Sequence, residues 1–357
     1  MMMNPTWKHE ERSGYTLRSL YRSYGYIPYK MSRFEEYDLY VRNKDFLVSD
    51  QIITFSDRSG RLLALKPDVT LSIVKNAPEE PGAVQKVYYQ ENVYRDYREI
   101  LQAGLECVGD LGEYEIAEVV LLAAKSLQLL GGRWVLDISH MGLLAAVLED
   151  SDLSREQQNQ AMEYLHRKNY HQLKALCAGN AAWAKLSAIA SSRGGQEALD
   201  QLEELLTTEA ERQALDQLKG LWKVLEASGF ADSIRLDFSV ANNMRYYSGV
   251  VFRGYLEGIP ASVLSGGQYD KLPQKMGRNA KAIGFAIYLG LLENRNRDED
   301  DFQVDTLIFH DGTADPMVLT AAAEEAAQKG TVLVTRELPK NRNWKQLLRF
   351  EKGAWVK

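Results

Sequence analysis

The sequence has few of the residues that mark metal-binding or disulfide-rich proteins. It contains only two cysteines, Cys107 and Cys177, which lie far apart. Neither belongs to a C-x-x-C pair, so we expect no zinc knuckle and no disulfide framework, as is usual in a reducing cytoplasm. The five histidines show no metal-ligand spacing. We therefore expect no metal site and no cofactor, and we expect His166 and His171 to be ordinary surface residues.

Long apolar runs and an excess of positive charge are also missing. No apolar run approaches the roughly 20 residues that cross a bilayer. The first residues, MMMNPTWKHEERSGY, contain no apolar core and no cleavage motif, which predicts that there is no secretory signal. Lys and Arg number 43 against 49 Asp and Glu, a net charge of −6. This balance does not suggest a nucleic-acid scaffold, although it leaves room for a local basic patch. We expect a cytoplasmic protein with no membrane and no nucleic-acid partner.

The common catalytic signatures are absent. The sequence has no P-loop G-x-x-x-x-G-K-[ST], no dinucleotide-binding G-x-G-x-x-G after a strand, no G-x-S-x-G and no H-E-x-x-H. A loop for phosphoribosyl diphosphate, in which acidic residues precede T-G-G, is missing as well. No catalytic residue can be assigned from these motifs.

What the sequence does contain is a regular alternation of helix and strand signals. Residues 15–29 carry apolar side chains at helical spacing until Gly25 ends the helix. After it we expect a strand, a turn at 57–60, a second strand closed by Pro67, and a helix that begins near Asp68. At 357 residues, the chain can form one large domain and a smaller one.

A second hairpin is predicted from QKVYYQENVYRD and ILQAGLECVG, with a short charged link at 97–99. In its second strand the apolar residues alternate with Gln102, Gly104 and Glu106, so these three share one face. A polar face with a glycine in its middle is typical of a sheet that receives a ligand.

The middle of the chain changes character. An apolar helix at about 113–129 and a strand at 133–140 are followed by residues 141–228, which are rich in Ala, Leu, Glu and Gln at helical period. Sheet-like sequence resumes at SIRLDFS and YYSGVVFRGYL. SGGQYD at 265–270 is predicted to be a turn, and the apolar segment AIGFAIYLGLL follows it.

The last segment predicts a separate small unit. NRNRDEDD at 294–301 reads as a solvated linker, and VDTLIFHD, DPMVLTAAAEEAAQKG and TVLVTREL read as strand, helix and strand. We therefore expect a core of residues 1–140 and 229–295, a helical insertion at 141–228 and a small C-terminal α/β unit at 302–357.

A set of polar side chains remains as the candidate site. Its members lie on predicted antiparallel strands or before a helix: Asp68, Arg95, Gln102, Glu106, Tyr246, Tyr247 and Tyr269. Each has an ordinary structural alternative. Glu106 could be a rim carboxylate paired to an arginine, the tyrosines could be core aromatics with one hydroxyl in water, and Asp68 could be only a helix cap.

Taken in order, these segments resemble the core of class II aminoacyl-tRNA synthetases, and specifically histidyl-tRNA synthetase, from about residue 10 to 292. YGYIPYKMSRFEEYDLY is similar to the first class motif, with Pro28 at its proline. LALKPDVT is similar to L-R-P-E-x-T, and NVYRDYREILQAGLECVG to the second motif, with Arg95 at its arginine. RYYSGVVF and SGGQYD resemble the histidine-binding signatures D-Y-Y-T-G-x-V-F and G-G-R-Y-D.

The resemblance implies an α+β fold, an antiparallel sheet flanked by helices, and it implies roles for single residues. Glu106 and Tyr247 match positions that bind the imidazole of histidine. Gln102, Asp68 and Thr70 match positions near its α-amino group. The implied histidine-binding set is completed by Arg95, Tyr246 and Tyr269.

The departures from the synthetase pattern fall on charges that act during amino-acid activation. Asn242 and Asn243 enter the stretch where the synthetase has the arginine of R-G-L-D. In the third motif, Leu291 stands at the arginine that holds ATP, and Tyr288 stands at a glycine. The link between the second-motif strands is also shorter. Since losing one such transition-state contact typically costs about 2.7–4 kcal/mol, we expect synthetase activity to be lost.

A synthetase core that keeps the amino-acid pocket without its activating arginines resembles the regulatory subunit of ATP phosphoribosyltransferase. This resemblance implies a homodimer that assembles with the short-form catalytic subunit, and feedback inhibition by free histidine at the first step of histidine biosynthesis. Two alternatives stay open. One is an active histidyl-tRNA synthetase in which Arg245 or Arg253 supplies the missing charge, and the other is a stand-alone histidine-binding or RNA-binding module.

Overall fold

The computed structural model describes residues 9–47, 51–78, 80, 82–180, 182–192, 194–240, 246–292, 304–340 and 343–356. The chain divides into two compact units, one of residues 13–291 and one of residues 1–12 and 292–357. The predicted linker at 294–301, the asparagines Asn242 and Asn243, and Arg245 lie outside the described residues.

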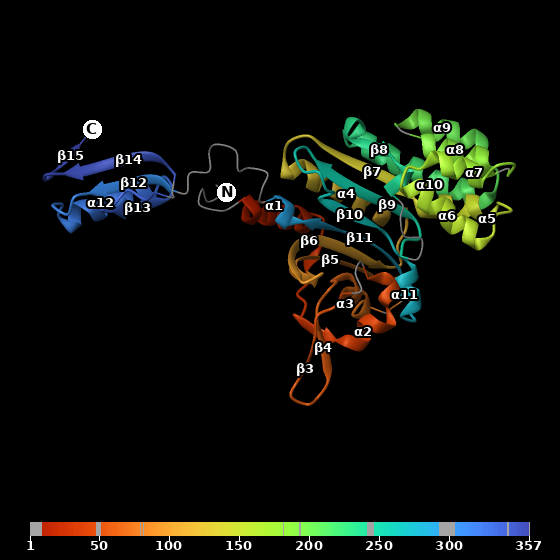
Figure 1. The fold of residues 1–357 in the computed structure, drawn as a ribbon, viewed down its shortest axis with the longest axis horizontal. Coiled ribbons are helices and arrows are strands. Elements are labelled where there is room, and N and C mark those ends of the chain that lie inside the picture. The colour runs from red at the N-terminus through yellow and green to blue at the C-terminus, as the bar shows by residue number, and fades with distance from the viewer. Residues whose placement is uncertain are drawn as a thin grey trace. The chain divides into compact units, whose positions relative to one another are not determined.

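The larger unit is built on an eight-stranded, mostly antiparallel sheet (Figure 1). Its strand order is β1-β5-β6-β11-β10-β9-β7-β8. The strands are β1 (Ile27–Pro28), β5 (Val84–Arg95), β6 (Arg98–Gly109), β7 (Trp134–His140), β8 (Ile234–Leu236), β9 (Val250–Leu256), β10 (Leu264–Gln268) and β11 (Lys281–Tyr288). Only β1 with β5 and β7 with β8 pair in parallel. This confirms the predicted α+β class and its antiparallel sheet.

Two sequence predictions within this sheet are wrong. The segment at 265–270 was expected to be a turn, but Ser265 to Gln268 belong to strand β10, between β9 and β11. Its glycines are there because a side chain at Gly266 would meet Phe285 and Phe252. The link of the β5–β6 hairpin is not 97–99 but Asp96 and Tyr97, whose positive φ angles of 51° and 59° form the two-residue turn that antiparallel strands favour.

One face of the sheet is covered by the long helix α4 (Glu113–Leu130), which packs on β7, β9, β10 and β11. Helix α1 (His9–Ser23) is joined to α4 where the hydroxyls of Tyr21 and Ser126 lie 3.0 Å apart. The buried side chains of α4 are mostly apolar, which is why the sequence pattern at 113–129 identified it correctly.

Further short elements flank these strands, and some of them supply part of the candidate site. They are β2 (Phe34–Glu36), α2 (Tyr37–Arg42), η1 (Lys44–Phe46), β3 (Thr54–Ser56), β4 (Leu62–Leu65), α3 (Thr70–Lys75), α11 (Lys271–Lys275) and η4 (Leu289–Leu292). Strands β2, β4 and β3 form a three-stranded sheet. Leu71, Ile73 and Leu272 are fully buried in the core that α3 and α11 share.

The described part of residues 141–228 consists of helices and the short loops that join them. The helices are α5 (Met141–Glu149), α6 (Arg155–His166), α7 (Tyr170–Leu176), α8 (Ala182–Ser191), α9 (Gln196–Leu205) and α10 (Glu209–Ala227), and the short turns η2 (Ala231–Ser233) and η3 (Phe238–Val240) follow. His171 is exposed as expected. His166 is half-buried and bonds through Nδ1 to the carbonyl of Ser239 at 2.8 Å, so it is a packing residue of this region.

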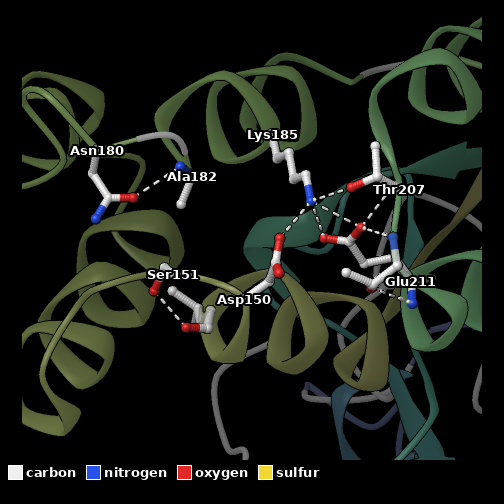
Figure 2. A network of polar contacts seen from close by, with 9 residues as sticks. Asp150, Ser151, Asn180, Ala182, Lys185, Thr207 and Glu211 are labelled. Carbon is white, nitrogen blue, oxygen red and sulfur yellow. Dashed lines mark hydrogen bonds and ion pairs between the residues drawn. The ribbon is translucent and has the colours of Figure 1, made fainter.

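A buried ion pair joins three of these helices (Figure 2). Lys185 on α8 reaches both carboxylate oxygens of Glu211 on α10, at 2.7 and 2.9 Å, and Asp150 at the end of α5, at 2.9 Å. Glu211 is fully buried and also accepts the backbone N–H groups of Thr207 and Thr208. The charge of Glu211 is therefore fully compensated, which makes this network a structural one.

The C-terminal unit contains a four-stranded sheet of order β13-β12-β14-β15. Its elements are β12 (Val304–His310), α12 (Pro316–Ala327), β13 (Val332–Thr335), β14 (Trp344–Glu351) and β15 (Ala354–Val356). The predicted strand, helix and strand are present, but β14 and β15 were missed because their polar and exposed residues interrupt the alternation. No helix in the described part of the chain is both long and apolar enough to cross a membrane.

Candidate functional site

All eight predicted site residues line one cavity of about 480 Å³ on the sheet face away from α4. They are Asp68, Thr70, Arg95, Gln102, Glu106, Tyr246, Tyr247 and Tyr269. The structure thus brings together residues from α3, the β5–β6 hairpin, the segment before β9 and the end of β10. Tyr89, Ser262 and Ser265 also line the cavity, and sequence reasoning did not place them in the site. Arg253, which it named as a substitute for the missing charge, and Tyr288, which it named as a departure from the third motif, line the cavity as well.

The floor of the cavity is a set of cross-strand rows fixed by the sheet register. Glu106 on β6 lies opposite Gly284 on β11, which lies opposite Gly267 on β10. In the next row, Gly104 is opposite Ala286, Ala286 is opposite Ser265, and Ser265 is opposite Arg253 on β9. Because residues directly opposite each other share a face, small side chains in the middle of these rows leave room for a ligand above the sheet.

Two glycines of this floor leave the space that neighbouring side chains occupy. A β-carbon at Gly284 would overlap the carboxylate of Glu106, and one at Gly267 would lie 2.8 Å from the ring of Tyr247. Any larger residue would displace the carboxylate or the ring. Gly284 is therefore a site residue that the sequence reasoning missed, since its function depends on a neighbour on another strand.

Glu106 is the most enclosed acidic group of the cavity, with 2% of its surface exposed. It accepts a hydrogen bond from Thr70 Oγ1 at 2.8 Å and another from the hydroxyl of Tyr269. No lysine or arginine pairs with it among the described residues. Burial, and to a smaller degree the nearby charge of Asp68, raises the pKa of Glu106 to about 8 against the hydroxyl hydrogen bonds. The alternative of a rim carboxylate paired to arginine is therefore wrong.

Asp68 combines two roles at the start of α3. Its Oδ1 accepts the backbone N–H of Leu71 at 2.9 Å, as a helix-capping group does. It also faces the cavity, and burial raises its pKa although Arg95 lies near enough to act in the opposite direction. The carboxylate can thus hold the helix and still meet a positively charged group in the cavity.

Arg95 ends strand β5 with 7% of its surface exposed. Its Nε has no hydrogen-bond partner, and no ion pair joins its guanidinium to any part of the chain that the structure describes. A buried guanidinium N–H without a partner is costly, because it loses its water and gains no hydrogen bond in return. This geometry suits an anionic group supplied by a ligand.

Three tyrosines close the cavity from the other side. The rings of Tyr246 and Tyr247 meet edge to face with centroids 4.6 Å apart, and Tyr246 and Tyr269 lie 5.7 Å apart. Burial raises the pKa of all three hydroxyls above the ordinary value, so they remain protonated hydrogen-bond donors. Tyr269, 2% exposed, uses its hydroxyl on Glu106.

Two of the positions that depart from the synthetase pattern, Leu291 and Tyr288, lie among the described residues. Leu291 is in η4 with 37% of its surface exposed, and it does not line the cavity. Tyr288 lines the cavity from β11, opposite Gln102, and its hydroxyl lies 2.9 Å from Ser265 Oγ. A phenol therefore occupies space that a glycine would leave open. The described residues contain no cluster of His, Cys, Asp and Glu that could hold a metal ion.

Comparison with known proteins agrees with this architecture. The histidyl-tRNA synthetase family profile matches residues 2–292. The chain is 30% identical over 285 residues to the ATP phosphoribosyltransferase regulatory subunit of Caldanaerobacter subterraneus subsp. tengcongensis, covering 76% of this chain and 74% of that one. It is 28% identical over 348 residues to the protein of the same name from Bacillus pumilus, covering 93% and 88%.

Solved structures show the same fold. An ATP phosphoribosyltransferase regulatory subunit/histidyl-tRNA synthetase from Bacillus halodurans C superposes with a TM-score of 0.78 at 24% identity, over 99% of this chain and 97% of that chain. A chain of the ATP phosphoribosyltransferase complex from Thermotoga maritima superposes with a TM-score of 0.62 at 19% identity, over 78% and 97%. These likenesses concern the fold, and the cavity described above is built within it.

Proposed function

We infer the role of the cavity from one premise: this chain belongs to the family of ATP phosphoribosyltransferase regulatory subunits, which carry a histidyl-tRNA synthetase core. It is accordingly a regulatory subunit of that enzyme and not itself a catalyst. We propose that free histidine is its effector, that histidine binds in the cavity around Glu106, and that binding inhibits the partner at the first step of histidine biosynthesis.

The proposal assigns each part of histidine to a group in the cavity. Glu106 and Tyr247 bind the imidazole. Asp68, with Thr70 and Gln102 beside it, receives the α-ammonium group. Arg95 receives the α-carboxylate, which compensates for the asparagine at position 242.

The observation that carries this assignment is the state of Glu106. The carboxyl group is buried, bonded only by hydroxyls, and has a pKa of about 8. A group of that pKa exchanges a proton readily with an imidazole, whose pKa is about 6.5. One proton shared between Glu106 and the ligand makes the pair neutral as a whole, so it can be buried at low cost.

Calorimetry of free histidine on the isolated chain tests the proposal. We expect binding, with Glu106→Ala losing at least tenfold in affinity, or about 1.4 kcal/mol. Glu226→Ala, which removes an exposed glutamate of α10, is the matched control and should bind like wild type. Equal affinity in Glu106→Ala would remove Glu106 from the site.

The lost synthetase reaction has its own assay. Adenylate formation needs positive charge where phosphate charge develops, and one such contact is worth about 2.7–4 kcal/mol. With an exposed leucine at position 291, histidine-dependent pyrophosphate exchange should be absent. Exchange at synthetase-like rates from clean protein would restore the alternative of an active synthetase.

The proposed assembly is a homodimer bound to the short-form catalytic subunit in the cytoplasm. Strand β1 forms one edge of the large sheet, and Ile27 in it is 61% exposed. Exposed apolar residues at a sheet edge favour pairing with a second copy through a two-fold axis. Light scattering should give a dimer, and a monomer at micromolar concentration would contradict it.

A further inference from the structure

Three residues of strand β11 face the cavity, and their side chains increase in size along the strand. Gly284 lies opposite Glu106 on β6, Tyr288 lies opposite Gln102, and Ala286 lies between them. Residues that alternate along a strand share one face of the sheet, so the three form one row of the floor. The floor is therefore open at the end near Glu106, and a phenol closes it at the end near Gln102.

The phenol of Tyr288 is held across the floor by a hydrogen bond. Its hydroxyl lies 2.9 Å from Oγ of Ser265 on β10, and Ser265 is the residue directly opposite Ala286. Tyr288 therefore reaches diagonally from its own strand to the next one, as long side chains can on one face of a sheet. Tyr288 and Ser265 are both half-buried, so the bond between them restricts the ring to this orientation.

The hydroxyl of Tyr288 also lies near the inner tyrosines of the cavity. Burial is the main cause of the raised pKa values of Tyr89 and Tyr247, and the nearby Tyr288 adds to both. Tyr89 comes from β5, and Tyr247 comes from the segment before β9. The phenol of Tyr288 thus lies between side chains from both sides of the cavity, in a place where a ligand would meet it.

The cavity continues on the other side of Ser265. Ser262 and Arg253 line this further part, and the register places Arg253 opposite the carboxyl group of Asp137 on β7. The whole cavity of about 480 Å³ falls in the range that holds drug-sized ligands, which is more than a single amino acid needs. Without the phenol, the pocket around Glu106 would open into this further space.

The proposed function, on which this inference rests, decides which end of histidine meets the phenol. The imidazole is assigned to Glu106 and the α-ammonium group to Gln102, four residues and about 14 Å apart along β6. The α-carbon of histidine then lies beside Tyr288. Asp68 and Thr70 close the side of α3, so a group added to the carboxyl end has room only across the floor, where the phenol lies.

We propose that Tyr288, held by Ser265, is a specificity-determining residue that limits the pocket to a free amino acid. The pocket accepts histidine and rejects histidine that is extended at its carboxyl group, as in a peptide, because the added residue would overlap the phenol. Discrimination against a larger ligand is obtained by such a clash and not by extra contacts to the smaller one.

Calorimetry on the full chain with three ligands tests the proposal. They are histidine, histidylglycine, which is extended at the carboxyl group, and glycylhistidine, which is extended at the amino group. We expect wild type to bind histidylglycine at least about a hundredfold more weakly than histidine. Tyr288→Ala should narrow this ratio at least about tenfold and change histidine affinity by less than about fivefold. Glycylhistidine should stay excluded in both proteins, because the side formed by Asp68 and Thr70 is unchanged.

Tyr288→Phe is the matched control, since it keeps the ring and loses only the hydrogen bond to Ser265. Its preference for histidine over histidylglycine should stay well above that of Tyr288→Ala. Tyr288→Leu takes the place of Tyr288→Ala if the alanine variant does not fold. The ratio of the two affinities in wild type needs no variant at all.

Three results would overturn the proposal. Wild type could bind histidylglycine as tightly as histidine. Tyr288→Ala could keep the wild-type ratio while it still binds histidine. Tyr288→Ala could also admit both dipeptides alike, which would mean that the cavity has loosened as a whole. Failure of the proposed function looks different, because wild type would then bind none of the three ligands, and the inference would fall with it.

Discussion

Glu106 in the cavity and Glu211 in the helical region are equally buried, yet they differ in what surrounds them. Burial acts to raise the pKa of Glu211, but the hydrogen bonds from Lys185 and two backbone N–H groups prevail and hold it below the ordinary value. Glu106 has only hydroxyl partners, and its pKa rises to about 8. In the helical region, groups of the chain itself compensate the buried carboxylate. In the cavity, the buried carboxyl group has no cationic partner from the described residues and can take one from a ligand.

The same difference extends to the cations. Lys185 meets three oxygen-bearing side chains in the helical region. Arg95 in the cavity has no ion pair with any residue that the structure describes, and its Nε has no hydrogen-bond partner. Unmet polar groups of this kind cost stability, so they gather where binding compensates them. The comparison separates a stabilising network from a binding site without reference to family.

Removing Lys185 should have the largest effect on stability. Lys185→Met leaves Glu211 buried and uncompensated, which should lower the free energy of unfolding by about 3–5 kcal/mol. Urea unfolding of wild type and variant measures this difference in the free energy of unfolding. The double variant Lys185→Met/Glu211→Gln should recover much of the loss, while Arg167→Met, which breaks an exposed pair with Glu163, should cost at most about 1 kcal/mol. A loss for Lys185→Met as small as the surface control would mean that the network is not structural.

Glu106 should instead make the free energy of unfolding depend on pH. Its pKa is about 8 in the folded protein against an ordinary 4.5, so between these values the folded state holds a proton that the unfolded state has released. Stability contributed by this group is therefore lost as pH rises toward 8. Relative to Glu106→Gln, the free energy of unfolding of wild type should fall by about 2 kcal/mol between pH 6 and 8. Parallel pH profiles for the two proteins would show that the carboxyl is already ionised.

Two glycines, one in the cavity and one in the helical region, should respond differently to substitution by alanine. Gly284→Ala adds a methyl group against the Glu106 carboxylate, and such overpacking costs about 1–3 kcal/mol. Histidine affinity should fall with it, because the carboxylate must move. Gly220→Ala in α10, where nothing lies within 4 Å of the new atom, should stabilise the protein by about 0.5–1 kcal/mol. Thermal unfolding and calorimetry on both variants measure these effects, and equal behaviour would contradict the assigned close contact.

The spacing of polar and apolar residues was enough to predict the elements in which each residue type reflects its own burial. The alternation in β6 identified Gln102 and Glu106 as residues of the polar face, and the apolar period identified α4. The order of the motifs along the chain, compared with the synthetase signatures, predicted eight site residues, and all eight line the cavity.

Local pattern failed where the reason for a residue lies on another strand. The glycines of β10 suggested a turn, but they are there because of Phe285, Phe252 and the Tyr247 ring. Gly284 joined the site only through the register of β11 with β10 and β6. Strands β14 and β15 were missed because half of their residues face solvent on a small sheet.

The most direct test of histidine sensing uses the reconstituted complex. The short catalytic subunit from the same organism is assayed for phosphoribosyl transfer to ATP with wild-type chain, with Glu106→Ala and alone. We predict that activity depends on this chain. Histidine should lower it by about 5- to 150-fold in wild type, a coupling of about 1–3 kcal/mol, and much less in Glu106→Ala. A catalytic subunit that is equally active and equally inhibited without this chain would contradict it.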